Sequence, residues 1–273
     1  MGQKVNPNIF RLGVNKTWNT SFCEKKTSDL ALYTFKNVEL ESYIQKFLID
    51  HNLILHEYKI HFSQSCLNIY ISYFIPTTFK TKKNIQQFSL TNKKFNEDFL
   101  LNKFIKGFNI FNKTNYKIVI TLNCINKKIT FLSYKQLNFV KKKLLLLRRY
   151  KTDTFNFDET FNLLLNAIIN KNSSFMVGTF IANKLKIIKK HNRFLKCIKH
   201  ILSLLIKSDF SMIKSIKIKI SGKINRARRT KNKIITIGDI PAQTISEKLN
   251  YSQTSKTHNP NGSLGVKIWI TEK

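Results

Sequence analysis

Three of the seven arginines in this chain of 273 residues lie within four positions, at Arg226, Arg228 and Arg229. Elsewhere the chain uses lysine for positive charge, with 41 lysines in all. A guanidinium binds a phosphate through two parallel hydrogen bonds and stacks on a nucleobase, and an ammonium does neither as well. A chain biased toward lysine should keep arginine where that geometry matters. The cluster therefore indicates a nucleic-acid contact, with chance clustering as the alternative.

A second group of basic residues falls on one face of a helix predicted over about 181–205. At 100° per residue, apolar residues gather on one side of this helix. The opposite side carries Lys186, Lys189, Lys190, Arg193 and Lys196. No acidic residue interrupts it, whereas a solvated surface helix usually alternates signs. This pattern favours a face that follows phosphates, and a merely solvated face is the alternative.

Motifs that would support catalysis are weak or missing. The stretch HEYKIH (56–61) has histidines five positions apart on a predicted strand, so they do not share the helical face of a zinc-protease signature. The acidic pairs at 97–98 and 158–159 are more simply charges at helix N-termini. The chain contains no GxxxxGK[ST] phosphate loop. We therefore expect a non-catalytic protein with no cofactor and no metal site.

One Gly-x-x-Gly stretch is present, from Gly262 to Gly265. In KH domains such a loop clamps a nucleic-acid backbone, and there it joins two helices. Here the stretch leads into a predicted terminal strand. We therefore interpret it as a turn.

The elements that position these residues follow from the spacing of apolar side chains. Helical periodicity predicts helices over 37–52, 95–108 and, as two long patterns, 158–208. Period-two alternation predicts strands at 55–62, 67–75, 116–125, 213–221, 233–238 and 265–273. The polar residues just before the last strand are expected to form a loop. This order indicates an α/β (α+β) fold, with helices packed on one face of a sheet in the second half.

Charge dominates the composition, because 48 basic residues face 15 acidic ones, for a formal net charge of +33. A compact body of that charge repels itself unless a polyanion neutralises it, and each neutralised phosphate also releases a condensed counterion. Hydrophobic residues make up 42% of the chain, enough for a real core. Apolar runs such as 69–75 fall far short of the ~20 residues of a membrane span. A membrane-surface protein would need an amphipathic helix with Trp or Phe at the boundary, and both tryptophans, Trp18 and Trp269, lie elsewhere.

Cysteine spacing and codon usage bear on the compartment. Cys23, Cys66, Cys124 and Cys197 include no CxxC pair, which excludes a zinc ribbon and favours free thiols in a reducing compartment. The first residues have neither a signal-peptide core nor an amphipathic presequence. Heavy use of Ile, Lys, Asn and Phe suggests an AT-rich genome. We therefore expect an organelle-encoded protein.

Both ends of the chain resemble one known family. The opening MGQKVNPNIFRLGV and the later segments SIKIKISGKINRARRT, GDIPAQTI and GSLGVKIWI are similar, in order, to the universal small-subunit ribosomal protein three family. The resemblance is specific over 1–18 and 213–273 and moderate over the basic helices. It is architectural over 37–125 and absent over 126–157.

The resemblance implies a domain organisation. It comprises an extended rRNA-binding tail (1–36), a KH-like domain of the second type (37–125), a lineage-specific spacer (126–157) and a C-terminal domain of helices on a mixed β-sheet (158–273). Where the family has its Gly-x-x-Gly loop, this chain has PTTFKTKKNIQQF (76–88), without glycine. The KH-like domain is therefore degenerate. Lysines in that loop can still hold phosphates.

The family lies in the head of the small ribosomal subunit, contacts ribosomal RNA and lines the channel by which messenger RNA enters. The resemblance therefore implies a structural ribosomal protein whose partners are rRNA, mRNA and neighbouring head proteins, with no membrane partner and no homo-oligomer. Bacterial members use three basic residues on a helix to unwind messages. Arg193 and Lys196 match two of those positions, and Asn192 stands at the third.

The predicted RNA contacts combine both lines of reasoning. They are Lys4, Arg11, Lys16, Lys80, Lys82, Lys83, Lys186, Lys189, Lys190, Arg193, Lys196, Lys223, Arg226, Arg228, Arg229 and Lys231. The polar segment Gly2–Pro7 is expected to order only against ribosomal RNA. We expect a mitochondrial ribosome, with a plastid as the second choice. The rival function is an organellar nucleic-acid-processing protein, for intron splicing or endonuclease cleavage.

Overall fold

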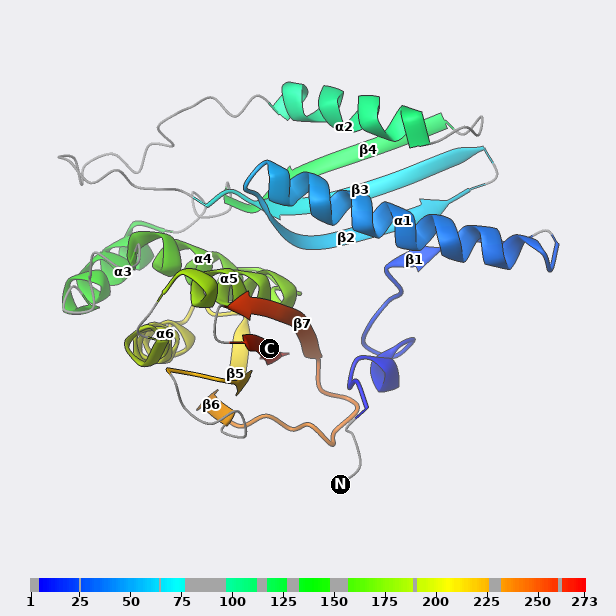
Figure 1. Cartoon of the computed structure of the whole chain (residues 1–273). Coiled ribbons are helices and arrows are strands. Elements are labelled where there is room, and N and C mark those ends of the chain that lie inside the picture. Colours follow the sequence, from blue (N-terminus) through cyan, green and yellow to red (C-terminus); the bar gives the residue numbers. More distant parts are fainter. Residues whose placement is uncertain are drawn as a thin grey trace.

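The computed structural model describes residues 5–24, 26–63, 65–76, 97–111, 117–126, 133–147, 157–188, 191–225, 232–259 and 262–273. Within these residues the chain forms two four-stranded sheets, each with its own hydrophobic core (Figure 1). This mixture of helices and sheets agrees with the predicted α+β class. The four cysteines are free thiols, as expected. None of the helices described here has the length and apolarity that crossing a bilayer requires.

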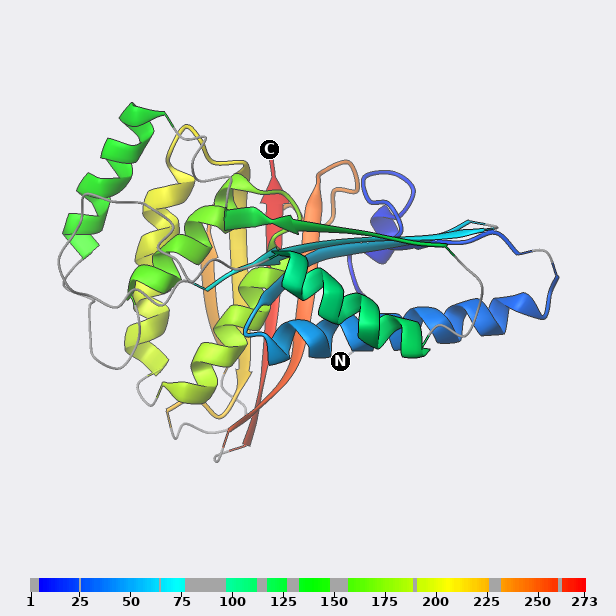
Figure 2. The ribbon, with the colours of Figure 1, turned by 90° about the horizontal axis from the view of Figure 1, so that it is seen from above.

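The first sheet has the order β1-β2-β3-β4. Its strands are β1 (Thr20–Ser21), β2 (Ile54–Phe62), β3 (Cys66–Phe74) and β4 (Lys117–Cys124). The β2–β3 pair is antiparallel, whereas β1–β2 and β3–β4 are parallel. Helices α1 (Asp29–Asp50) and α2 (Glu97–Phe111) lie on one face (Figures 1 and 2). The predicted order of helix, two strands, helix and strand is confirmed.

Helix α1 begins eight residues earlier than the periodicity predicts. Leu40, Ile44 and Leu48 are buried against the sheet, at the helical spacing of four. Leu32 and Phe35, in the first turns, are exposed, so no apolar stripe marked that part of the helix. The predicted tail of 1–36 is therefore too long, because α1 already occupies its last residues.

The second sheet has the order β6-β5-β8-β7. Its strands are β5 (Ile213–Gly222), β6 (Asn232–Ile237), β7 (Leu249–Asn259) and β8 (Gly262–Glu272), and its helices are α4 (Phe157–Ile169), α5 (Ser174–Ile187) and α6 (His191–Ile206). All three strand pairings are antiparallel, so the predicted mixed sheet is wrong. The helices pack on one face, as expected, where Ile216, Ile218 and Ile220 are buried.

The single helix predicted over 181–205 is also wrong. Helix α5 ends at Ile187, and Ile188 has an extended backbone, with φ −83° and ψ 125°. Helix α6 starts at His191, whose backbone N–H donates to the side-chain oxygen of Asn225 over 3.0 Å. Apolar positions on both sides of the break stay buried, because each helix turns its own apolar side to the core. No glycine or proline marks the break in the sequence, so the apolar periodicity continues across it and predicts one helix.

Strand β7 occupies the segment that was predicted as a loop. Its inward positions include Ser252 and Thr254, which are small and polar, so the usual apolar alternation is missing. They lie close to Gly178 of α5, where a Cβ atom would come within 2.8 Å of the Thr254 side chain. The Ser252 hydroxyl donates to the Ser174 carbonyl over 2.8 Å. Close approach and a hydrogen bond therefore replace apolar packing at this strand.

Two shorter segments also have defined structure. Gly262, with φ +122°, pairs with Asn259 at the β7–β8 hairpin, and the Gly-x-x-Gly stretch forms the first four residues of β8, so its reading as a turn is wrong. The expected spacer contains helix α3 (Tyr134–Leu147). Leu147 is buried in the second core, and the Phe139 ring lies 6.5 Å from that of Phe210. This helix is thus attached to the second sheet and its helices.

Candidate nucleic-acid interface

The polar side of α6 carries two of the predicted RNA contacts. Phe194, Leu195 and Ile198 are buried in the core, so the opposite side of the helix must face solvent. Arg193 and Lys196 are exposed there, while Lys186 is exposed on α5. Because the predicted helix is in fact two helices, these cations do not form one continuous stripe. Of the predicted basic face, Arg193 and Lys196 lie together on α6.

A hollow of about 370 Å³ lies beside this pair. It is lined by Asn192, Arg193, Lys196 and Asn225. Asn225 has a left-handed backbone, with φ +48°, and its side chain caps the N-terminus of α6. Asn225 directly precedes Arg226 in the sequence, and Arg226 itself lies outside the described residues.

Lys233 of β6 adds a further cation, which was missing from the predicted contacts. Its ammonium donates to the side-chain oxygen of Asn192. Burial, and second the nearby charge of Lys196, lower the pKa of Lys233 below its usual value. An anion bound here would relieve the repulsion between the two ammonium groups. Only the packing of α6 on β6 brings Lys233 to this site, so no local pattern could have marked it.

Two predicted contacts are corrected, because their side chains are used inside the protein. Arg11 is only 2% exposed, and its guanidinium group donates to four backbone carbonyls. The acceptors belong to Pro7, Ala242, Thr244 and Glu247. Lys16 donates to the side-chain oxygen of Asn250 over 2.5 Å, and burial lowers its pKa. Within the segment Gly2–Pro7, which was expected to order only against RNA, residues 2–4 lie outside the described structure, whereas the Pro7 carbonyl already accepts from Arg11.

The other predicted contacts divide into two groups. Lys223 is exposed at the end of β5, close to the hollow in sequence. The remaining ten lie outside the described residues: Lys4, Lys80, Lys82, Lys83, Lys189, Lys190, Arg226, Arg228, Arg229 and Lys231.

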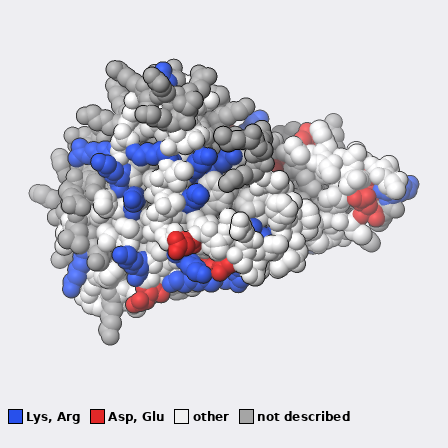
Figure 3. Space-filling model, turned by 90° about the horizontal axis from the view of Figure 1, so that it is seen from below, with Lys and Arg blue, Asp and Glu red and all other residues white. Residues whose placement is uncertain are grey.

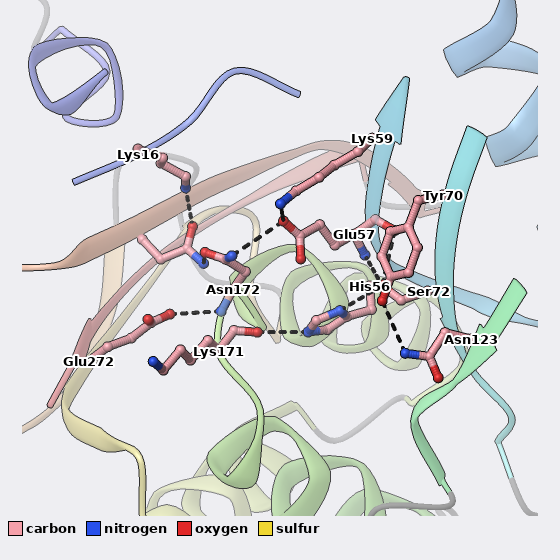
Figure 4. Close-up of polar contacts among 11 residues, drawn as sticks. Lys16, His56, Glu57, Lys59, Tyr70, Ser72, Asn123, Lys171, Asn172 and Glu272 are labelled. Carbon is pink, nitrogen blue, oxygen red and sulfur yellow. Dashed lines mark hydrogen bonds and ion pairs between the residues drawn. The ribbon is translucent and has the colours of Figure 1, made fainter. Parts of the chain in front are cut away.

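A polar joint connects the tail, β2, the α4–α5 turn and β7 and β8 (Figure 4). Asn172, with φ +57°, stands at its centre. Its backbone N–H donates to Glu272 over 2.7 Å and its amide donates to Glu57 over 3.3 Å, while Asn250 donates to its side-chain oxygen over 3.2 Å. Asn250 also accepts from Lys16. The joint therefore links both sheets and the tail.

A cavity of about 300 Å³ adjoins this joint and includes His56 of the HEYKIH stretch. Both ring nitrogens of His56 are hydrogen-bonded, to the Ser72 hydroxyl and to the Lys171 carbonyl, each over 2.9 Å. His61 instead contacts the Ser21 hydroxyl over 2.6 Å. In the described part of the chain, no group of three histidine, cysteine or acidic residues is placed to hold a metal ion. His56 therefore connects the first sheet to the turn between α4 and α5.

Comparison with known proteins gives consistent results. No family model matches the sequence. The small ribosomal subunit protein uS3c of Euglena longa is 29% identical over 212 residues, which are 71% of this chain and 94% of that protein. The uS3c protein of Guillardia theta is 24% identical over 56% of this chain and 70% of that protein. The uS3 protein of Karelsulcia muelleri (strain GWSS) is 26% identical over 65% of this chain and 76% of that protein.

Proposed function

Because this chain belongs to the universal small-subunit ribosomal protein family uS3, we propose that it binds ribosomal RNA through the hollow at the start of α6. Its role is that of a structural ribosomal protein and not that of an enzyme, in keeping with these relatives. The rival function in nucleic-acid processing receives no support from them.

One observation supports the RNA contact more than any other: Arg193 and Lys196 line the hollow, and Lys233 contacts Asn192 in its wall. Arg193, Lys196 and Lys233 have no ion-pair partner in the described part of the chain. The N-terminus of α6 adds partial positive charge beside them. Such a group is costly without an anion, and a phosphate supplies one. The three side chains contribute the positive charge that a phosphate requires.

We propose that the same residues can also face the message at the entry channel. Asn192 stands where bacterial relatives place the third of their message-unwinding basic residues. Here its side chain receives the ammonium of Lys233. Lys233 can therefore supply, from a neighbouring strand, the positive charge that Asn192 lacks. The proposed message contact is the set Arg193, Lys196 and Lys233.

The proposed domain division follows the two cores. Residues 29–125 form the degenerate KH-like domain, supported by the order of its elements and by α1 and α2 lying on one face of its sheet. Residues 158–273 form the C-terminal domain, to which α3 of the expected spacer is attached. The tail bridges them, since β1 pairs with β2 while Arg11 bonds the segment before β7.

The proposed location is the ribosome of an organelle. The relatives from Euglena longa and Guillardia theta carry the plastid-type name uS3c, which favours a plastid over a mitochondrion. The preference for a mitochondrion gains no specific support from them.

A double variant tests the RNA contact. Arg193→Gln with Lys196→Gln should weaken binding to the head region of small-subunit rRNA and reduce the slope of log affinity against log salt by about 0.7–0.9 per lost contact. The matched control is Lys46→Gln with Lys106→Gln, which removes the same charge from exposed positions of α1 and α2. Equal losses in both variants would show that only net charge matters and would overturn the proposal.

A further inference from the structure

The outer face of the second sheet carries a row of aromatic and basic side chains. The strand register places Lys217 of β5 opposite Trp269 of β8, and Trp269 opposite Tyr251 of β7. The Tyr251 and Trp269 rings have centroids 5.2 Å apart, and the Lys217 ammonium lies 5.6 Å from the Trp269 ring. All three are half-buried and point away from the helices. We call these three residues, together with Lys219 and Lys267 of the next row, the outer platform.

The next row of the outer platform is basic. Lys219 of β5 lies directly opposite Lys267 of β8, two residues farther along each strand. Like charges directly opposite each other on neighbouring strands destabilise a sheet. In the part of the chain that the structure describes, neither lysine has a carboxylate partner, whereas Lys214 of the same strand pairs with Glu247 at 3.1 Å. The pair therefore leaves a positive charge that an anion can neutralise.

Core packing does not account for these side chains. The alternate residues of the same strands, including Ile218 and Ile268, already fill the core under the helices. An exposed lysine row alone would serve solubility, but a soluble surface does not require a half-buried tyrosine and tryptophan in ring contact. Seen from below, lysines and arginines gather over the broad end of the molecule that holds the second sheet (Figure 3). Aromatic faces flanked by unpaired lysines match the chemistry of single-stranded nucleic acid.

We propose that the outer platform binds unpaired nucleotides of RNA. A base stacks on the exposed part of the Trp269 and Tyr251 rings, while the adjoining phosphates contact Lys217, Lys219 and Lys267. Stacking accepts any base, so the site distinguishes unpaired from paired RNA more strongly than one sequence from another. This surface is separate from the hollow at α6 and goes beyond it, although it rests on RNA being the partner of the protein.

The two tryptophans of the chain allow a direct test. Trp18 is 67% exposed in the tail, so Trp18→Phe leaves Trp269 as the single indole. A short unstructured RNA should quench the fluorescence of Trp269 in the full chain, whereas inorganic polyphosphate, which has charge but no bases, should not. Trp269→Leu should weaken RNA binding by about tenfold, and Trp269→Phe should retain most of the affinity because it keeps a ring.

Charge variants separate the outer platform from the α6 hollow. Lys219→Gln with Lys267→Gln should lower the salt dependence of binding, and Lys214→Gln, whose ammonium is already paired, should not. The double variant Arg193→Gln with Lys196→Gln should still show full quenching of Trp269 at saturating RNA. The outer platform can therefore be tested even if the α6 hollow does not bind RNA. Equal quenching by polyphosphate, unchanged binding by a folded Trp269→Leu protein, or a Trp269 signal that responds only to another ribosomal protein would each overturn the inference.

Discussion

Asn8 and Tyr251, separated by 243 positions, exchange two hydrogen bonds. The Asn8 side-chain amide donates to the Tyr251 carbonyl over 2.7 Å, and its oxygen accepts from the Tyr251 N–H over 3.0 Å. One side chain thus satisfies both backbone groups at the free edge of β7, in the way a neighbouring strand would. The tail therefore protects the edge of the sheet that carries the outer platform.

Replacing Asn8 should weaken the second sheet. Asn8→Ala removes both bonds and should lower the free energy of unfolding by about 1–2 kcal/mol, since each bond contributes roughly 0.5–1.5 kcal/mol. Asn8→Asp keeps the acceptor and should lose only part of this. Urea unfolding of the full chain measures the difference. Equal stability of the alanine variant and the parent protein would mean that the tail is not fixed in solution.

Arg11 should contribute to stability and not to RNA binding. Arg11→Met leaves buried carbonyls without a donor and should lower the free energy of unfolding by about 3 kcal/mol, the scale of a hydrogen bond to a charged group. Arg193→Met makes the same change at an exposed position and should leave the thermal melt unaltered. A variant at Arg11 that melts normally but binds RNA poorly would reverse this assignment.

Asn225 should fix the start of α6 in two ways. Its side chain caps the helix, and its backbone is left-handed, which asparagine and glycine tolerate better than alanine. Asn225→Asp keeps the acceptor, Asn225→Gly keeps only the backbone, and Asn225→Ala keeps neither. Melting temperatures should fall in that order, with about 2 kcal/mol lost by alanine. A glycine variant as unstable as alanine would show that the backbone conformation is unimportant.

RNA affinity should depend on pH through Lys233. Its pKa in the free protein lies below 10.5, because of burial first and Lys196 second, and a bound phosphate raises it again. Between the pKa of Lys233 in the free protein and its higher pKa in the complex, RNA binding takes up a proton. The affinity for RNA should therefore fall as the pH rises through this range. Between the lowered pKa of Lys233 and its ordinary value of 10.5, the unfolded chain holds more protons than the folded protein. The free energy of unfolding of the free protein should therefore rise with pH over this range. Lys233→Met should remove both dependences, which binding and unfolding measurements across alkaline pH can compare.

The arginine loop lies outside the described residues, and its role stays a prediction. Changing Arg226, Arg228 and Arg229 together to lysine keeps the charge but removes the planar fork. We expect normal folding and a loss of about 1–3 kcal/mol in RNA affinity. Arg193→Lys should matter little if α6 only follows phosphates. Identical behaviour of the two lysine variants on reconstituted subunits would reduce the cluster to simple charge.

Strand prediction succeeded where side-chain alternation and burial coincide. Ile216, Ile218 and Ile220 alternate with lysines, and the pattern alone identifies β5. It failed for β7, because Ser252 and Thr254 fill inward positions that depend on Gly178 of a distant helix. Alternation identifies a strand only where its inward side chains are apolar. It does not detect a strand whose inward side chains are small, polar and closely packed.

The candidate site was predictable only in part for the same reason. The exposure of Arg193 and Lys196 follows from helical spacing within α6. Lys233 and Asn225 join them through tertiary contacts, which no local pattern contains. Arg11 was assigned to RNA because the family resemblance implies an rRNA-binding tail. Its actual acceptors are carbonyls more than 230 positions away, apart from that of Pro7.

The attachment of the tail has a consequence for biosynthesis. Residues near Asn8 and Arg11 leave the translating ribosome early, yet their partners around Thr244 and Tyr251 emerge more than 200 residues later. Contacts of such high sequence separation form late and slow the folding of a chain. During that interval Asn8 and Arg11 lack their partners within the protein. The tail can therefore dock only after the segment around Thr244 and the strand β7 have been synthesised, which makes it a late step in folding.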